Sequence, residues 1–342
     1  MFFASDNTAP THPAIMAALQ HANETYARSY GDDDLMLRVR TQIRDLFQAP
    51  EAAVYLVATG SAANALAVAC HVQPWQAVFC HEDAHIATDE CNAPEFYSGA
   101  KLALIPGAHG KITPDALTAA LSKIGESGVH GVQRGMLSLT NVTEAGTVYS
   151  PAEIAVLTAL AKQHNLPCHL DGARFANALV ATNATPAAMT WAAGIDVLSL
   201  GGTKNGCMGV EAVVIFDPAK AWEFELRRKR GGHLFSKHRY LSAQMVAYLQ
   251  DGLWLTLATH ANAMAARLHQ SLARIPGATL RHAVDANILF PTLAPGTNAR
   301  AAAKGAVYYN WLTPEGTEAA RFVTSWSTTE QDVDNLLQAL HP

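Results

Sequence analysis

The 342-residue chain lacks several features that would assign it to a special class of protein. It has no run of about 18 apolar residues, so we do not expect a membrane-spanning helix. Its first residues contain no basic segment followed by an apolar core, so a signal peptide is not expected. Charged residues make up only 15% and hydrophobic residues 49%, which is typical of a well-buried enzyme and not of a disordered chain.

Cysteines and basic clusters are also scarce. The five cysteines are odd in number and none forms a Cys-x-x-Cys pair, so reduced thiols in the cytoplasm are the simplest interpretation. The net charge is −5, and the largest basic block is residues 227–230, so a nucleic-acid partner is not expected. This block is either a solvated helix face or a phosphate-binding cluster.

The chain does contain short apolar runs that alternate with helical patterns. Seven runs have the continuous apolar character of strands buried on both faces: 54–57, 77–80, 102–105, 136–140, 167–170, 197–200 and 212–216. Helices are expected at 62–70, 114–124 and 151–164. Thr113 and Ser150 precede prolines as N-caps of the last two. The alternation predicts an α/β fold with a mostly parallel sheet.

The pattern changes after residue 216. The elements expected there are a long helix at 241–274, strands at 287–293, 306–311 and 321–324, and a last helix at 330–340. The length of the chain is too great for one simple core. We therefore predict a large domain over residues 1–245 and a small α+β C-terminal domain over residues 246–342.

Two apolar runs end in residues suited to chemistry. The run at 197–200 ends in glycines that lead to Lys204, and the run at 167–170 ends at Asp171. A lysine for a Schiff base and an acid for a pyridine nitrogen are what a pyridoxal phosphate enzyme needs. Alternatively, Lys204 is an ordinary surface charge and Asp171 only forms an ion pair with Arg174.

Gly60 and Ser61 lie between an apolar run and a helix. A glycine allows close approach of the backbone, and the free N–H groups at a helix start attract a phosphate. Because such turns are common, a purely structural turn is the alternative.

Several histidines lie near expected strand ends. His81, Glu82 and His85 match the His-Glu-x-x-His motif of zinc peptidases. That chemistry needs both histidines on one face of a regular helix, whereas this motif directly follows an expected strand. We prefer His85 in the active site, stacked on a cofactor ring, over a zinc site or an unremarkable polar loop. His130, in a glycine-rich loop, is either solvated or a general base.

Two further segments are candidates for substrate binding. Arg321 opens an apolar segment and either solvates a strand edge or makes a two-pronged contact with a substrate carboxylate. The N-terminal segment that contains Ser5 and the loop at 30–33 are polar enough to line a site.

These segments resemble the threonine aldolases of the β-eliminating lyase family over almost the whole chain. The most specific stretches are His-Leu-Asp-Gly-Ala-Arg at 169–174, Ser-Leu-Gly-Gly-Thr-Lys-Asn-Gly at 199–206, Tyr-Gly-Asp-Asp at 30–33 and Arg-Phe-Val-Thr at 321–324. The resemblance implies a fold-type I pyridoxal phosphate enzyme with a mostly parallel seven-stranded sheet. It implies cleavage of threonine, allo-threonine or related β-hydroxy-α-amino acids to glycine and an aldehyde, by a homodimer or homotetramer with shared sites.

The resemblance also implies roles for single residues. Cofactor contacts are implied for Lys204 (Schiff base), Asp171 (pyridine nitrogen), His85 (ring stacking), Gly60 and Ser61 (phosphate), Arg174 (cofactor or substrate) and Arg230 (phosphate, across a subunit interface). Arg321 would bind the substrate carboxylate with help from Ser5 and Arg174. The base would be His85 or His130.

Two segments depart from the family pattern. Many members read Leu-Glu-Asn-Thr-His where this chain has Leu-Thr-Asn-Val-Thr-Glu-Ala-Gly at 139–146, and the common Gly-Gly-Gly-Met-Arg-Gln is replaced at 231–239. A distinct branch is indicated, such as one that prefers phenylserine. Another pyridoxal phosphate lyase or an aminotransferase on the same fold is the first alternative. A non-catalytic binding module and a zinc peptidase are more remote ones.

Overall fold

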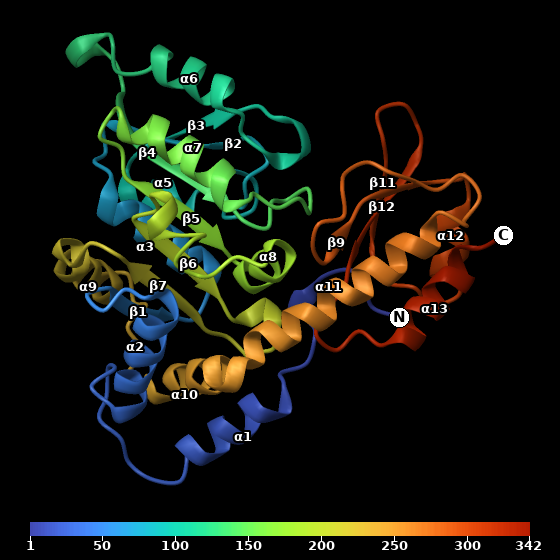
Figure 1. Cartoon of the computed structure of the whole chain (residues 1–342), viewed down its shortest axis with the longest axis horizontal. Helices are drawn as coiled ribbons and strands as arrows, with labels where there is room; N and C mark the ends of the chain where they lie inside the picture. Colours follow the sequence, from blue (N-terminus) through green and yellow to red (C-terminus); the bar gives the residue numbers. More distant parts are fainter.

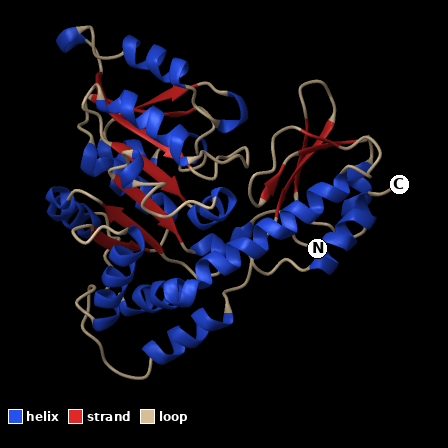
Figure 2. Ribbon diagram, in the orientation of Figure 1, coloured by secondary structure: helices blue, strands red, loops and turns tan.

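The computed structural model describes residues 1–342 and consists of a larger α/β unit and a smaller α+β unit (Figure 1). The larger unit contains a seven-stranded sheet and the smaller one a five-stranded sheet. Helices cover both faces of the larger sheet, so its strands are enclosed (Figure 2). None of the helices combines the length and the apolar character needed to cross a bilayer.

The larger sheet confirms the prediction of seven mostly parallel strands. Its order is β1-β7-β6-β5-β4-β2-β3, and only β7 runs antiparallel to its neighbours. The strands are β1 (Ala53–Val57), β2 (Gln76–His81), β3 (Lys101–Ile105), β4 (Gln133–Thr140), β5 (Cys168–Gly172), β6 (Val197–Gly201) and β7 (Glu211–Ile215). Five of them, β1, β2 and β5 to β7, are buried along nearly all their length, which explains their continuous apolar sequences.

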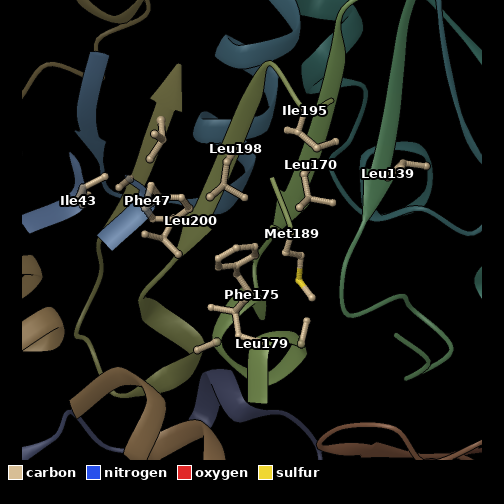
Figure 3. Close-up of a cluster of buried hydrophobic side chains, with 14 of the residues drawn as sticks. Ile43, Phe47, Leu139, Leu170, Phe175, Leu179, Met189, Ile195, Leu198 and Leu200 are labelled. Carbon is tan, nitrogen blue, oxygen red and sulfur yellow. The ribbon is translucent and has the colours of Figure 1, made fainter. Parts of the chain in front are cut away.

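The hydrophobic core between this sheet and its helices consists mainly of aliphatic side chains packed with the rings of Phe47 and Phe175 (Figure 3). Phe47 ends α2 (Asp34–Phe47) and stacks on Phe175, the first residue of α8 (Phe175–Thr182), with ring centroids 5.8 Å apart. Leu170 of β5 is fully buried in the same cluster. Because α8 begins three residues after β5 ends, this packing fixes the direction in which the chain leaves β5.

Two helices of the large unit begin at the caps that the sequence predicts. Thr113 accepts a hydrogen bond from the Ala116 amide at 3.2 Å, and Ser150 forms a capping box with Glu153. Both predicted caps are confirmed. The remaining helices up to the domain connection are α1 (Pro13–Ala22), α3 (Gly60–His71), α4 (His85–Thr88), α5 (Ala93–Ser98), α6 (Pro114–Lys123), α7 (Pro151–Lys162) and α9 (Ala221–Arg230).

The long helical stretch expected over residues 241–274 is present but interrupted. The structure has two helices, α10 (Arg239–Leu249) and α11 (Leu253–Leu272). Asp251 and Gly252 separate them with φ of 51° and 72°, a left-handed conformation that ends an α-helix. Consequently α10 packs on α1 and α2, while α11 carries the chain to the small unit (Figure 1).

The small unit is an antiparallel sheet packed on helices. Its elements are β8 (Thr279–Leu280), β9 (Ile288–Leu289), β10 (Pro291–Leu293), α12 (Thr297–Ala303), β11 (Tyr309–Leu312), β12 (Glu318–Val323) and α13 (Glu330–Leu340). The one strand expected at 287–293 is split in two, because Pro291 has no N–H to continue the ladder. The predicted last helix is confirmed residue for residue.

The N-terminal residues lie with the small unit. Phe2 bridges to Val307, and Phe3 is fully buried in a cluster whose other members run from Met264 to Leu340. The predicted division places these first residues in the large domain, because sequence order carries no sign of this return. The boundary at residue 245 otherwise stays a prediction.

We predict that Phe175→Ala destabilises the protein by about 3–5 kcal/mol, because it removes a buried ring and leaves a cavity. Urea unfolding monitored by circular dichroism measures the loss. Val129→Ala, at a position 93% exposed, is the control and should change stability by less than about 0.5 kcal/mol. Equal stability of both variants would contradict this account of the core.

Candidate active site

A cavity of about 240 Å³ lies at one edge of the larger sheet. The loops after β1, β2, β4, β5 and β6 all reach it. The antiparallel strand β7 begins there, since Glu211 pairs with both Val57 and Gly201. Ligands of open α/β sheets bind outside the carboxyl ends of the parallel strands, which is where this cavity is located.

Lys204 and Asp171 line this same cavity. Asp171 is the second-last residue of β5. Lys204 lies in the short helix η5 (Thr203–Asn205), directly after β6. The two strands are hydrogen-bonded neighbours, with Asp171 in register with Ser199. The expectation that an amine and a carboxylate approach one site from adjacent strand ends therefore agrees with the geometry.

Glycines allow β5 and β6 to approach so closely at these ends. A Cβ built on Gly172 would lie 2.7 Å from the carbonyl oxygen of Ser199. One built on Gly201 would lie 2.2 Å from the carbonyl oxygen of Ala173, a distance that no side chain tolerates. The Asp-Gly and Leu-Gly sequences at the two strand ends are thus required by packing, not by turn conformation.

The Asp171 carboxylate is buried and has no cationic partner. Its Oδ1 accepts a hydrogen bond from the Ala173 amide and its Oδ2 accepts one from Asn64 Nδ2, both at 3.0 Å. A buried carboxylate is stable when a cation completes its environment. The cavity side of Asp171 therefore suits a protonated ring nitrogen.

The start of α3 forms another wall of the cavity. Thr59 caps the helix by accepting a hydrogen bond from the Ala62 amide at 3.2 Å, and Gly60 and Ser61 line the cavity. A Cβ built on Gly60 would meet no protein atom within 4 Å, so the missing side chain leaves space open. An open helix start with free N–H groups and the Ser61 hydroxyl fits a phosphate group.

His85 begins α4 and lines the cavity with a quarter of its side chain exposed. Its Nδ1 lies 2.8 Å from Glu90 Oε1, and its Nε2 lies 3.5 Å from Asp89 Oδ2. The hydrogen bond to Glu90 raises the pKa of His85, while partial burial opposes the rise. An imidazole in this position can stack on a planar ligand or exchange a proton with it.

The two histidines of the His-Glu-x-x-His motif lie on different elements. His81 ends strand β2, and its two ring nitrogens are engaged by the Gly107 carbonyl and the Asp83 amide. Only His85 is helical. No group of three side chains in the chain has the arrangement of a metal site.

His130 does not line the cavity, and its expected place in the active site stays a prediction. It lies in the exposed short helix Gly128–His130, which precedes β4. The cavity collects loops that follow parallel strands, and this loop enters β4 from the opposite edge. The direction of β4 determines which edge of the sheet this loop reaches, and a glycine-rich loop sequence does not reveal that direction.

Arg230 also lies outside this cavity. It is exposed at the end of α9 and lines a separate hollow of about 610 Å³ beside Tyr97 and Leu226. A contact with the phosphate of a neighbouring subunit stays a prediction.

Arg174 forms a buried ion pair with Asp6. Its Nε and Nη2 donate to the two carboxylate oxygens at 2.6 and 2.8 Å, and Asn287 donates a third hydrogen bond to Asp6 at 3.0 Å. Burial would raise the pKa of Asp6, but the Arg174 charge and these hydrogen bonds hold it below its usual value. Since Arg174 does not line the cavity, its contact with Asp6 is structural. A contact of Arg174 with the cofactor or the substrate stays a prediction.

Arg321 is a half-buried cation without a carboxylate partner. Its Nη1 donates to the carbonyl oxygen of Ala4 at 3.2 Å. Burial lowers its pKa, and the nearby Arg174 charge lowers it further. Ser5 caps the next short helix by accepting from the amide of Asn7, a residue that lines the cavity. Arg321 itself does not line the cavity, so a contact with a substrate carboxylate stays a prediction.

The cavity residues that the sequence did not predict include one amide and three carboxylates: Asn64, Glu90, Glu144 and Glu211. Asn64 interrupts an alanine-rich helix, and Glu211 opens an apolar strand, so both were visible as polar residues in apolar surroundings. Glu144 belongs to the departing segment 139–146. Glu90 follows the histidine motif and carried no signal.

Glu211 is buried beside the lysine loop. Its Oε2 accepts a hydrogen bond from the Gly202 amide at 3.0 Å. Burial raises its pKa to about 7, although Thr203, Gly202 and the Lys204 charge lower it. Its carboxyl group therefore holds the backbone that presents Lys204.

We predict that Glu211→Gln gains stability relative to the wild type as pH rises from about 5 to 8. The folded-state pKa lies above the unfolded one, so the stability contributed by protonated Glu211 is lost as pH rises toward 7. The difference in Tm between variant and wild type, measured at both pH values without cofactor, tests this. Glu51→Gln, at an exposed position, is the control. A pH-independent difference for Glu211→Gln would contradict the prediction.

Comparison with known proteins agrees with this geometry. The model of the family described as β-eliminating lyase matches residues 3–294. Over 335 residues the chain is 40% identical to the low-specificity L-threonine aldolase of Pseudomonas sp. (strain NCIMB 10558), covering 98% of this chain and 95% of that protein. The corresponding enzyme of Pseudomonas aeruginosa gives the same identity and coverage. A solved threonine aldolase of Leishmania major matches with a TM-score of 0.93 and 30% identity, over 99% of this chain and 98% of that one.

Proposed function

Because the chain belongs to the β-eliminating lyase family, we propose that it is a pyridoxal-phosphate-dependent aldehyde-lyase of the threonine aldolase type. Its substrates are L-threonine, L-allo-threonine and related β-hydroxy-α-amino acids, and its products are glycine and an aldehyde. The observation that carries the proposal is the convergence of Lys204 and Asp171 on one cavity.

The residues present fit the cofactor. Lys204 would hold it covalently, Asp171 would keep a proton on its ring nitrogen, and the start of α3 at Gly60 and Ser61 would hold its phosphate. When bound, the cofactor supplies an electron sink for the electrons that are released when the Cα–Cβ bond of the substrate breaks.

The substrate would be oriented by Arg321 and the N-terminal segment, of which Asn7 lines the cavity. Arg321 binds the α-carboxylate, supported by the N-terminal segment that contains Ser5 and Asn7. Fixing the carboxylate turns the Cα–Cβ bond to the orientation in which it breaks, an effect worth several kcal/mol of the barrier.

His85 is the general base in this proposal. It is the only one of the two expected histidines in the cavity, and Glu90 engages its Nδ1. The Nε2 atom accepts the proton of the β-hydroxyl group, which allows the carbonyl of the aldehyde to form. His85 or Lys204 then returns a proton to Cα, and glycine leaves.

The assembly and the cellular compartment of the protein are proposed from its surface and its cysteines. Large apolar side chains are exposed on α5 and α9, where Phe96 is 82%, Trp222 72% and Leu226 52% exposed. Such a patch supports a homodimer or homotetramer, which would bury it and bring Arg230 toward a neighbouring site. All five cysteines are free, which supports a reducing compartment such as the cytoplasm.

Lys204→Ala is expected to lose the absorbance band of the bound cofactor and nearly all cleavage activity, because no other amine lines the cavity. The spectrum of the purified protein and the release of glycine and aldehyde from threonine measure this. Lys123→Ala, at an exposed position, should leave both unchanged. Formation of a keto acid with ammonia by the wild type would favour elimination instead, and formation of a keto acid without ammonia would favour transamination.

Arg321→Lys should raise KM for threonine about 10- to 100-fold with a smaller change in kcat. Lysine keeps the charge but cannot make the two-pronged contact, and hydrogen bonds to charged groups are worth about 1.5–3 kcal/mol. Steady-state kinetics measure the change, with Arg281→Lys as an exposed control. An unaltered KM would remove Arg321 from the substrate site.

A further inference from the structure

Glu90 is a buried carboxylate in the cavity wall, in contact with both His85 and Asn64. Its side chain is fully buried in the turn between α4 and α5. Oε1 receives hydrogen bonds from His85 at 2.8 Å and Asn64 at 2.9 Å, whereas Oε2 has no partner. Burying a carboxylate costs desolvation free energy, so a buried carboxylate in a cavity wall suggests a functional role.

Asn64 extends the contact to the other side of the cavity. Its Nδ2 donates to Glu90 at 2.9 Å and to Asp171 at 3.0 Å. Ionised carboxylates only accept hydrogen bonds, so the amide must present its two N–H groups to them. The outcome is an unbroken hydrogen-bonded path from His85 through Glu90 and Asn64 to Asp171.

The path determines the state of the His85 ring. With Glu90 as acceptor, the proton of the neutral ring lies on Nδ1 and the lone pair on Nε2. The other charges that face the ring are Asp89, Asp171 and Glu144, which favour the protonated form, and Lys204, which opposes it. Of the carboxylates, only Glu90 is both fully buried and hydrogen-bonded to the ring at 2.8 Å.

We infer that Glu90 is a positioning residue: it fixes the Nδ1–H tautomer of His85, aims Nε2 at the β-hydroxyl group of the substrate, and joins this base to Asp171 through Asn64. The inference rests on the proposed function and adds a residue that the family motifs above do not contain. The arrangement parallels the orienting carboxylate of a Ser-His-Asp triad, which holds the imidazole in one tautomer.

The kinetic test is Glu90→Gln, which keeps the shape and removes the charge. We expect kcat for threonine cleavage to fall about 100-fold, within the range for a displaced general base, while the cofactor band and glycine affinity remain within about 2-fold. Cleavage requires neutral His85, so kcat rises with pH through its pKa. Loss of the Glu90 charge lowers that pKa, so the acid limb of the pH–kcat profile, where kcat rises with pH, moves to lower pH.

A matched control is Glu95→Gln, the same substitution five residues later. Glu95 also has a buried oxygen without a partner, but it does not line the cavity. Its pH profile should equal that of the wild type. Glu90→Asp, which retains the charge but is shorter by one methylene group, should lose activity and keep most of the acid limb.

The tautomer can be read without turnover. Nitrogen-15 spectra of histidine-labelled protein, assigned with His85→Asn, should show Nδ1–H for His85 in the wild type at pH 8. Failure of the wild type to cleave threonine would refute the proposed function, but it would not affect the tautomer measurement. An Nε2–H tautomer, or a Glu90→Gln variant with wild-type kcat and acid limb, overturns the inference.

Discussion

The close approach of β5 and β6 at their carboxyl ends is the constraint on which the site depends. Glycines at positions 172 and 201 leave no room for a side chain against the neighbouring backbone. Any Cβ there would separate the strand ends that carry Asp171 and the Lys204 loop. Helix α8 begins just beyond and packs Phe175 into the core, so the same few residues serve the fold and the chemistry.

Charge is distributed unevenly around the cavity. Asp171 and Glu90 form an acidic wall on the side of the larger sheet, joined by the neutral amide of Asn64. Arg321 belongs to β12 of the small unit and has no carboxylate partner, because the nearby Asp6 is already paired with Arg174. An amino acid bound with its carboxylate toward Arg321 and a cationic ring toward Asp171 would match this polarity.

The sequence was sufficient for the sheet and for the residues at strand ends. Continuous apolar runs mark buried strands, and Asp171 and Lys204 follow two of them directly, so the periodic pattern placed them correctly. It could not place His130, because the edge a loop reaches depends on strand direction and not on the loop itself. It could not foresee Glu90 or the break at Asp251 either. The first depends on a tertiary contact with a helix from another part of the chain, and the second on a left-handed backbone at a non-glycine residue.

The path of the first residues has a mechanical consequence. The chain leaves the small unit after Phe3, passes the buried Asp6–Arg174–Asn287 junction into α1, and returns only through α11. Two covalent links therefore join the units, so no single cut in the chain separates them. A fragment that ends before α11 would lose the residues that bury Phe3 and the bridge between Phe2 and Val307.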